Sequence, residues 1–264
     1  MFYSNKEILM LDGIYHEVGH LEQLAKDDEQ YYGYLGKAAL SSSSIKMLLQ
    51  SPKTYHYVTT YGGNNNSKAL LIGKLFHLAV LEPHKMDEVV VVDVQSRATK
   101  KFKEAVEANE GLDVVTAKEE KDVRRLQDAM LRNEKVLSYL KDAEFEIPRV
   151  DLLDGMPFRA KADILQGNHI IDLKTTSDLS AFKYSAYKYG YDVQVYIYCN
   201  LFGIPPENFH FVAIDKGSLD IGVYHVGEEF YESGMKRTQK GIDLYRKFFQ
   251  EGIDLDSYYI EETL

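Results

Sequence analysis

Apolar side chains recur at helical spacing over much of the first half of the chain. Residues 68–81 are apolar on most sides and stop before Pro83, which predicts a largely buried helix. In residues 41–52 a serine run precedes apolar positions, a pattern typical of a capped short helix. A third helical region is predicted over residues 96–142, where one side carries Val123, Leu126, Met130, Leu137 and Leu140.

Three extended segments come next, with turn signals between them. They cover residues 144–150, 156–165 and 169–175, and the turns are Asp154-Gly155 and Gly167-Asn168. A long helix is predicted over residues 180–201. The other predicted elements are strands at 88–93, 208–214 and 219–225 and a last helix at 227–250. This order predicts an α/β fold with one mixed central sheet flanked by helices.

A single domain over residues 1–264 fits this order, because no internal repeat and no Pro-, Gly- or Ser-rich linker divides it. Residues 1–40 begin with a polar, Tyr-rich stretch without periodicity, so we predict an N-terminal arm of irregular structure. Residues 41–142 form an added, mainly helical region in this prediction. Residues 143–225 form the sheet core, and residues 226–264 form a C-terminal helix and tail.

Composition narrows the class of protein. The formal net charge is −10, whereas a protein that coats nucleic acid usually has a basic excess. An enzyme with a carboxylate metal site remains compatible, because its lysines and arginines can gather in one groove. The one cysteine, Cys199, excludes an internal disulfide, and its apolar neighbours favour a small buried residue. We expect a cytoplasmic protein, because we see no signal-like segment and no apolar run near the roughly 18 to 20 residues of a membrane helix.

Charged residues alternate with apolar ones on two neighbouring predicted strands. One strand is expected to have a charged and an apolar face: Arg159, Lys161 and Asp163 against Phe158, Ala160, Ala162 and Ile164. On the next strand Asp172 and Lys174 share a face. If these strands pair, Asp163 and Asp172 come close enough to share a divalent cation, with Lys174 beside it.

These groups suit phosphodiester hydrolysis. A cation held by carboxylates neutralises phosphate oxygens and acidifies water, and a lysine can orient that water and stabilise the transition state. Standing alone, such a motif is more often a solvated sheet face. The apolar pair Ile170-Ile171 argues for an interior strand, where unpaired charges would be costly.

Several other polar residues have two interpretations. His77 lies inside the apolar helix and, taken alone, is typical of a satisfied core histidine. Gln194 and Tyr198 are four residues apart and project from one side of their helix. The cations on the polar side of residues 96–142 also have two interpretations: the simpler is a solvated helix surface, and the alternative is a surface that faces DNA. These cations are Lys118, Lys121, Arg124, Arg125, Arg132 and Lys135.

Four segments in order resemble the motifs of the RecB-type branch of PD-(D/E)XK nucleases. They are GKLFH at 73–77, RAKAD at 159–163, IDLKTT at 171–176 and QVYIY at 194–198. Within that branch, LSSSSIK at 40–46 and the Leu-Glu-Pro that ends the helix are similar to the phage and prophage exonuclease VIII (RecE) group. The resemblance covers about residues 40 to 200.

The resemblance implies a restriction-endonuclease-like core and a role for each motif residue. Asp163, Asp172 and the Leu173 carbonyl would bind Mg²⁺, and Lys174 would be the catalytic lysine. His77 would lie at the metal as a further ligand and catalytic group. The residues implied to support the motif or to contact DNA are Gln194, Tyr198, Arg159, Lys161 and Thr175. One further metal-binding carboxylate would come from Glu144 or Glu146.

The resemblance also implies ATP-independent degradation of linear duplex DNA from its ends, 5′ to 3′, in phage or prophage recombination or DNA repair. Mg²⁺ would be the cofactor, with Mn²⁺ able to substitute, and no nucleotide or iron-sulfur cluster is expected. Partners would be DNA ends, a single-strand annealing protein and further copies of the chain in a ring; a phage-encoded protein would act in the host cytoplasm. Two alternatives stay open: an endonuclease or single-strand-specific nuclease with the same site, and a non-cleaving DNA-binding protein on this scaffold.

Overall fold

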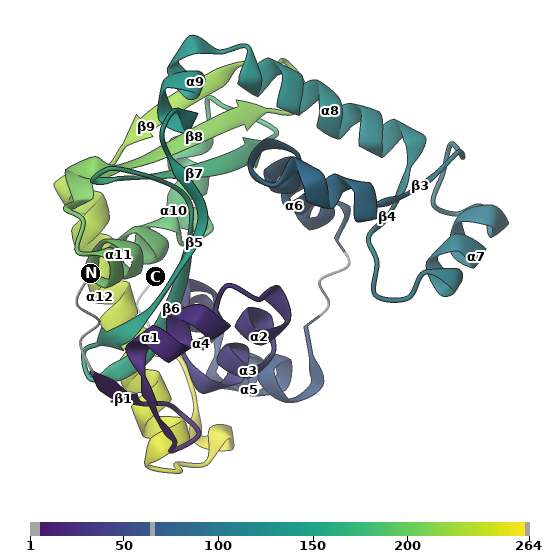
Figure 1. Cartoon of the computed structure of the whole chain (residues 1–264). Helices are drawn as coiled ribbons and strands as arrows, with labels where there is room; N and C mark the ends of the chain where they lie inside the picture. Colours follow the sequence, from purple (N-terminus) through teal and green to yellow (C-terminus); the bar gives the residue numbers. More distant parts are fainter. Residues whose placement is uncertain (1–5, 64–66, 262–264) are drawn as a thin grey trace.

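A mixed sheet of five strands forms the centre of the molecule (Figure 1). This computed structural model describes residues 6–63 and 67–261. The strands lie in the order β5 (Glu144–Leu153), β6 (Met156–Gln166), β7 (His169–Thr176), β8 (Phe209–Asp215) and β9 (Ile221–His225). The first three form an antiparallel meander, β8 runs parallel to β7, and β9 is antiparallel to β8. The predicted α/β fold with a mixed central sheet is confirmed.

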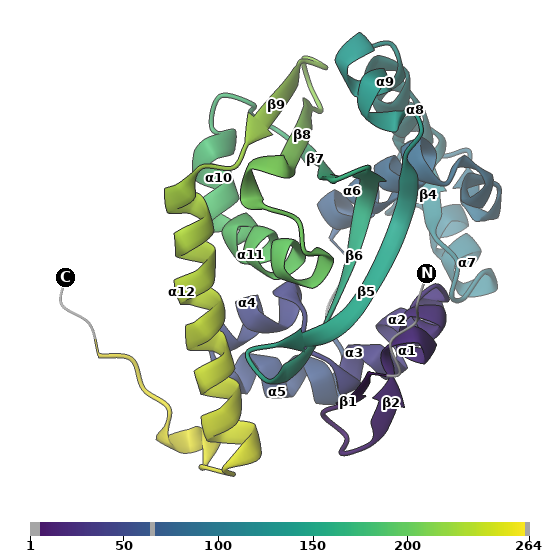
Figure 2. The ribbon, with the colours of Figure 1, turned by 60° about the vertical axis from the view of Figure 1, so that its left-hand side comes forward.

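One face of the sheet is covered by α11 (Tyr191–Phe202), which lies between β5–β6 and the long helix α12 (Glu228–Tyr245). The helix α4 (Ser42–Gln50), capped by the Ser41 side chain, packs against both. Figure 2 shows α12 running past α11. The apolar cluster between these elements includes Ile45, Phe158, Val193 and Phe211. After α4 the chain continues into α5 (Pro52–Tyr61).

The other face is covered by α6 (Lys68–Leu81), which packs against α8 (Ala117–Leu131), and by α9 (Glu134–Leu140). Its cluster joins Leu75, Leu126, Ile171 and Val212. Buried apolar side chains on both faces therefore make β7 and β8 interior strands, as Ile170-Ile171 predicts for β7. None of the helices within the described residues is both long and apolar enough to cross a membrane.

Residues 6–40 form regular structure, so the prediction of an irregular arm was wrong for them; residues 1–5 of that arm lie outside the described residues. The described part forms a hairpin of β1 (Glu7–Leu9) and β2 (Tyr15–Glu17) and the short helices α1 (Val18–Leu24), α2 (Asp28–Tyr32) and α3 (Tyr34–Ala38). Each element is too short to show a period. Their apolar residues meet in a cluster with Val150 of β5: Ile8, Leu21, Tyr31 and Leu35.

Two further predictions of long helical stretches need correction. Residues 96–142 contain α7 (Lys100–Ala108) and then the strand β4 (Val114–Thr116), which pairs with β3 (Val90–Val92), before α8 and α9 begin. β-Branched side chains at Val114 and Val115 favour that strand. The helix predicted over 180–201 is broken into α10 (Phe182–Lys188) and α11, because Gly190 between them has a positive φ of 67°. The predicted last helix continues from α12 into a π-helical turn, Arg246–Gln250.

Candidate metal centre

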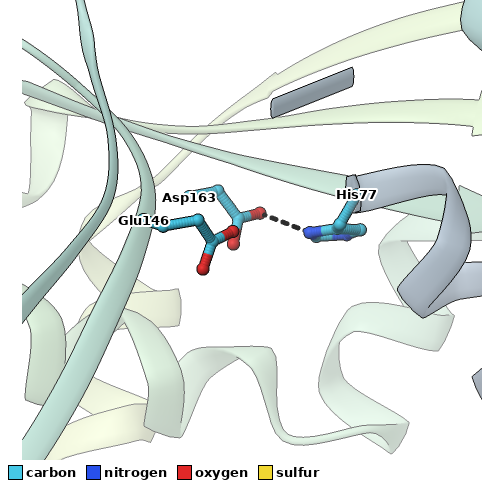
Figure 3. Close-up of side chains that lie close together, drawn as sticks. All are labelled: His77, Glu146 and Asp163. Atoms are coloured by element: carbon cyan, nitrogen blue, oxygen red, sulfur yellow. Dashed lines mark ion pairs between the residues drawn. The ribbon is translucent and has the colours of Figure 1, made fainter. Parts of the chain in front are cut away.

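Three side chains from three separate elements converge beside the sheet (Figure 3). They are His77 of α6, Glu146 of β5 and Asp163 of β6, each with one nitrogen or oxygen atom within 4.8 Å of the others'. His77 Nδ1 lies 3.3 Å from Asp163 Oδ2. Of the residues that the structure describes, only these form such a group of potential metal ligands.

Strand register explains why Glu146 faces Asp163. Phe145 pairs with Ile164 and Ile147 pairs with Ala162, so Glu146 stands opposite Asp163. Glu146 has a positive φ of 51°, which is unfavourable for a residue with a side chain and is common at functional sites. Glu144, the other acidic residue considered, is exposed.

The side-chain alternation of β6 changes at this same point. Ala162 belongs to the cluster on the α11 side, whereas Ile164 belongs to the cluster on the α6 side. The prediction that Ile164 shares a face with Phe158 and Ala160 was therefore wrong. The distorted backbone at Glu146 lies directly opposite the change, so strict alternation could not reveal it.

The register of β6 and β7 ends with Ile164 opposite Ile171, next to Asp163 and Asp172, but the two carboxylates make different contacts. Pairs from Gln166–His169 to Ile164–Ile171 set this register. Asp163 Oδ2 accepts a 2.7 Å hydrogen bond from the Leu173 amide. Asp172, which is 1% exposed, accepts a hydrogen bond from Gln194 Nε2 and pairs with the Lys174 ammonium. Asp172 thus lies beside the three-residue group and not within it.

Lys174 is held from two sides. Its ammonium pairs with Asp172 and lies 4.8 Å from the centre of the Tyr191 ring and 5.7 Å from that of Phe211. Burial disfavours the charged form, but Asp172 and Asp163 outweigh burial and raise the pKa of Lys174. The lysine therefore stays charged beside the carboxylates.

The acidic groups do not all ionise easily. Burial and the neighbouring Asp163 charge raise the pKa of Glu146 to about 8. Burial also raises the pKa of Asp172 to about 6. Burial acts against ionisation of Asp163 too, yet the adjacent His77 lowers the pKa of that carboxyl, and Asp163 in turn raises the pKa of His77 against the effect of burial. Ionised carboxylates crowded in this way repel one another, and a bound cation would relieve that repulsion.

Arg159 and Lys161, the other cations on the strand of Asp163, are covered by the N-terminal helices. Each lies 4.4 Å from the centre of the Tyr31 ring, and Lys161 also pairs with Asp28. Tyr32, 67% exposed, lies over the same two cations. Sequence analysis missed these contacts because the tyrosines belong to the segment predicted to be irregular. The high frequency of tyrosine in that segment was the signal that could have indicated aromatic contacts.

The other predicted residues lie away from the three-residue group of potential ligands. Tyr198 is buried beside Phe202 and Phe209, which suits a supporting role more than a DNA contact. Thr175 is partly buried, with its hydroxyl 3.9 Å from where a Cβ on Gly73 would lie. On α8, three predicted surface cations have partners within the chain: Lys118 with Asp122, Arg124 with Glu120, and Arg125 with the Lys216 carbonyl.

One family match and one solved structure agree with this architecture. Residues 41–254 match the model of a family described as "PDDEXK-like domain of unknown function (DUF3799)". A crystal structure of a candidate exonuclease from Eubacterium rectale is similar over 90% of this chain and 95% of its own, with a TM-score of 0.66 and 14% identity, which shows a shared fold. A phage related exonuclease from Haemophilus somnus 129PT aligns over 67% of this chain and 94% of its own, at 15% identity and a TM-score of 0.33. No curated protein matches the sequence.

Proposed function

Since this chain belongs to the PDDEXK-like domain family, we propose that it is a nuclease that uses a divalent metal to hydrolyse phosphodiester bonds of DNA. Membership of the PD-(D/E)XK superfamily, predicted from four short motifs, is confirmed by that match. One observation carries the proposal: His77, Glu146 and Asp163 converge beside the ion pair of Asp172 and Lys174.

The donor set fits a hard or borderline divalent cation. Two carboxylates and one imidazole lie within reach of a common ion, and carboxylates are preferred ligands of Mg²⁺ and Mn²⁺, while imidazole suits transition metals better. We propose Mg²⁺ as the cofactor, with Mn²⁺ able to replace it, held by Asp163, Glu146 and His77, with Asp172 and the Leu173 carbonyl contributing. When bound, the cation supplies positive charge against the phosphate and lowers the pKa of a water molecule.

The protein's own groups supply positioning and charge. Lys174 would orient the attacking water and stabilise the negative charge that develops on the phosphate. Asp172 holds that ammonium in place, and Gln194 holds Asp172 through its amide. The Leu173 amide fixes the carboxylate of Asp163, so the geometry is set before substrate binds.

The motif resemblance to the RecE group supports a finer proposal: an ATP-independent exonuclease that degrades linear duplex DNA 5′ to 3′ in phage or prophage recombination. Arg159, Lys161 and Thr175 are proposed as DNA-contacting or supporting residues, and Tyr198 as a supporting one. The annealing partner, the ring assembly and the cytoplasmic location remain predictions from that resemblance.

The test is digestion of end-labelled linear duplex and closed circular DNA with Mg²⁺, Mn²⁺ or EDTA. Lys174→Ala and Asp163→Asn should each lower the rate at least about a hundredfold, with unchanged circular dichroism, while the exposed control Lys240→Ala should keep wild-type activity. Full activity in Lys174→Ala or Asp163→Asn would exclude the role given to that residue. Cleavage of the circle would indicate an endonuclease, and DNA binding without metal-dependent cleavage would favour the non-cleaving alternative.

A further inference from the structure

A dense run of tyrosine and lysine forms most of α10 and leads into α11. Residues 183–191 read KYSAYKYGY, with four tyrosines, two lysines and no acidic residue, in a chain of net charge −10. We call these residues the tyrosine-lysine segment. Its local positive charge contrasts with the acidic molecule around it and is complementary to a polyanion.

Much of this segment faces solvent. Tyr184 is 72% exposed and Tyr189 is 54% exposed. Phe182 and Ala186 are the buried residues of α10, so the helix packs through them and turns its other side outward. Tyr184 and Lys188 lie four residues apart on that helix, on one side of it. Large exposed rings next to exposed lysines form a surface on which bases can stack while phosphates are neutralised.

The segment is continuous with the proposed active site. Lys188 Nζ lies 5.8 Å from the centre of the Tyr189 ring, and the centroids of Tyr189 and Tyr191 are 6.1 Å apart. Tyr191 in turn lies 4.8 Å from the ammonium of Lys174. The left-handed turn at Gly190 joins the two rings. An unbroken series of aromatic and cationic groups therefore runs from the proposed catalytic lysine to the surface.

We propose that the tyrosine-lysine segment binds single-stranded nucleic acid next to the proposed cleavage site, with Tyr184 and Tyr189 as base-stacking residues and Lys183 and Lys188 as phosphate contacts. The inference rests on the proposed nuclease function and adds which form of the substrate this surface holds. A single strand is favoured over a duplex because paired bases are already stacked on each other, whereas an unpaired base can place its face on a tyrosine ring.

The experiment measures binding by fluorescence anisotropy in EDTA, which prevents cleavage. The probes are a labelled oligothymidine of about 20 nucleotides, long enough to span one binding site, and a blunt duplex of the same length. The double variant Tyr184→Ala/Tyr189→Ala should bind the single strand roughly tenfold more weakly for each ring lost, with a smaller change for the duplex. Tyr184→Trp/Tyr189→Trp should restore single-strand affinity, because stacking is kept.

The matched control is Tyr57→Ala/Tyr61→Ala on α5, whose rings are 61% and 72% exposed. This variant should bind within twofold of wild type, and melting curves should match for all variants. An unchanged affinity in Tyr184→Ala/Tyr189→Ala, an equal loss in the control, or an equal loss for duplex overturns the inference. If the wild-type protein cuts DNA but the expected binding losses are not found, only the inference about the tyrosine-lysine segment is overturned. If the protein binds single strands through these rings but never cuts DNA, only the nuclease proposal is overturned.

Discussion

At the residue scale, the candidate metal centre is a balance of buried charges. Asp163 keeps a lowered pKa because His77 stands beside it, and the raised pKa of Glu146 reflects burial and the charge of Asp163. Each added negative charge therefore costs more than the last. A bound divalent cation would offset that cost and favour the ionised form of Glu146.

Glu146→Gln tests this balance. The pKa of Glu146 rises from 4.5 to about 8 on folding, so between these values the folded chain binds more protons than the unfolded chain, and its stability falls as pH rises. Glutamine does not ionise, so in EDTA the melting temperature of the variant should exceed that of wild type increasingly from pH 5 to pH 8. DNA cleavage should nevertheless decrease, because a proposed ligand is lost. If the melting temperatures of the variant and the wild type change equally with pH over this range, the role assigned to Glu146 is contradicted.

At the scale of elements, α12 fixes α11 beside the sheet through close backbone approach and a buried ion pair. Asp192, fully buried in the first turn of α11, accepts hydrogen bonds from Arg237 and Ser233 of α12, each 2.7 Å long. Gly234 packs so tightly here that a Cβ on it would lie 2.0 Å from the Asp192 carbonyl oxygen. Because α11 also carries Gln194 and Tyr191, which contact Asp172 and Lys174, this contact helps to position the proposed active site indirectly.

Gly234→Ala is expected to destabilise the protein. Alanine is normally about 1 kcal/mol better than glycine within a helix, but the clash is with backbone, which cannot move without separating α11 and α12, so a net loss of about 1–3 kcal/mol is expected. Urea unfolding measures it. Lys240→Ala on the exposed side of α12 should change stability by less than about 0.5 kcal/mol. A Gly234→Ala variant as stable as wild type would show that the two helices pack less closely.

At the scale of the whole molecule, the candidate centre lies where separately formed parts meet. α6 brings His77 from one layer, the meander brings the carboxylates, and α11 on the opposite face holds Asp172 and Lys174. Ligand binding at such a junction ties the layers together. Metal binding should therefore stabilise the folded chain as a unit.

Mn²⁺ at about a hundred times its dissociation constant should contribute about 2.7 kcal/mol, a rise in melting temperature of about 5–10 °C. At one fixed Mn²⁺ concentration the rise should be larger at pH 8 than at pH 6, since Glu146 and Asp172, with pKa values of about 8 and 6, must lose protons to bind metal and the dissociation constant therefore falls with pH. Differential scanning fluorimetry measures it, and Asp163→Asn should abolish the shift. A shift that is the same at both pH values would argue against these two carboxylates as ligands.

The order of elements from β5 to α12, apart from the break at Gly190, and the chemistry of the central strands were determined by the sequence alone. Side-chain alternation placed Asp172 and Lys174 together on a strand, and the apolar pair Ile170-Ile171 correctly indicated an interior position, because both patterns depend only on local geometry and on burial of nearby residues. The match of residues 41–254 to a PDDEXK-like family agrees with what the short motifs predicted.

Only the tertiary structure decided which groups meet. Glu146 reaches Asp163 through strand register and a positive φ, and His77 approaches through packing of α6 on the sheet. The N-terminal helices likewise depend on contacts with distant residues, Val150 among them. A sequence pattern records the local preference of each segment, whereas these contacts join residues far apart in the chain, and their free energy appears only once the layers have packed together.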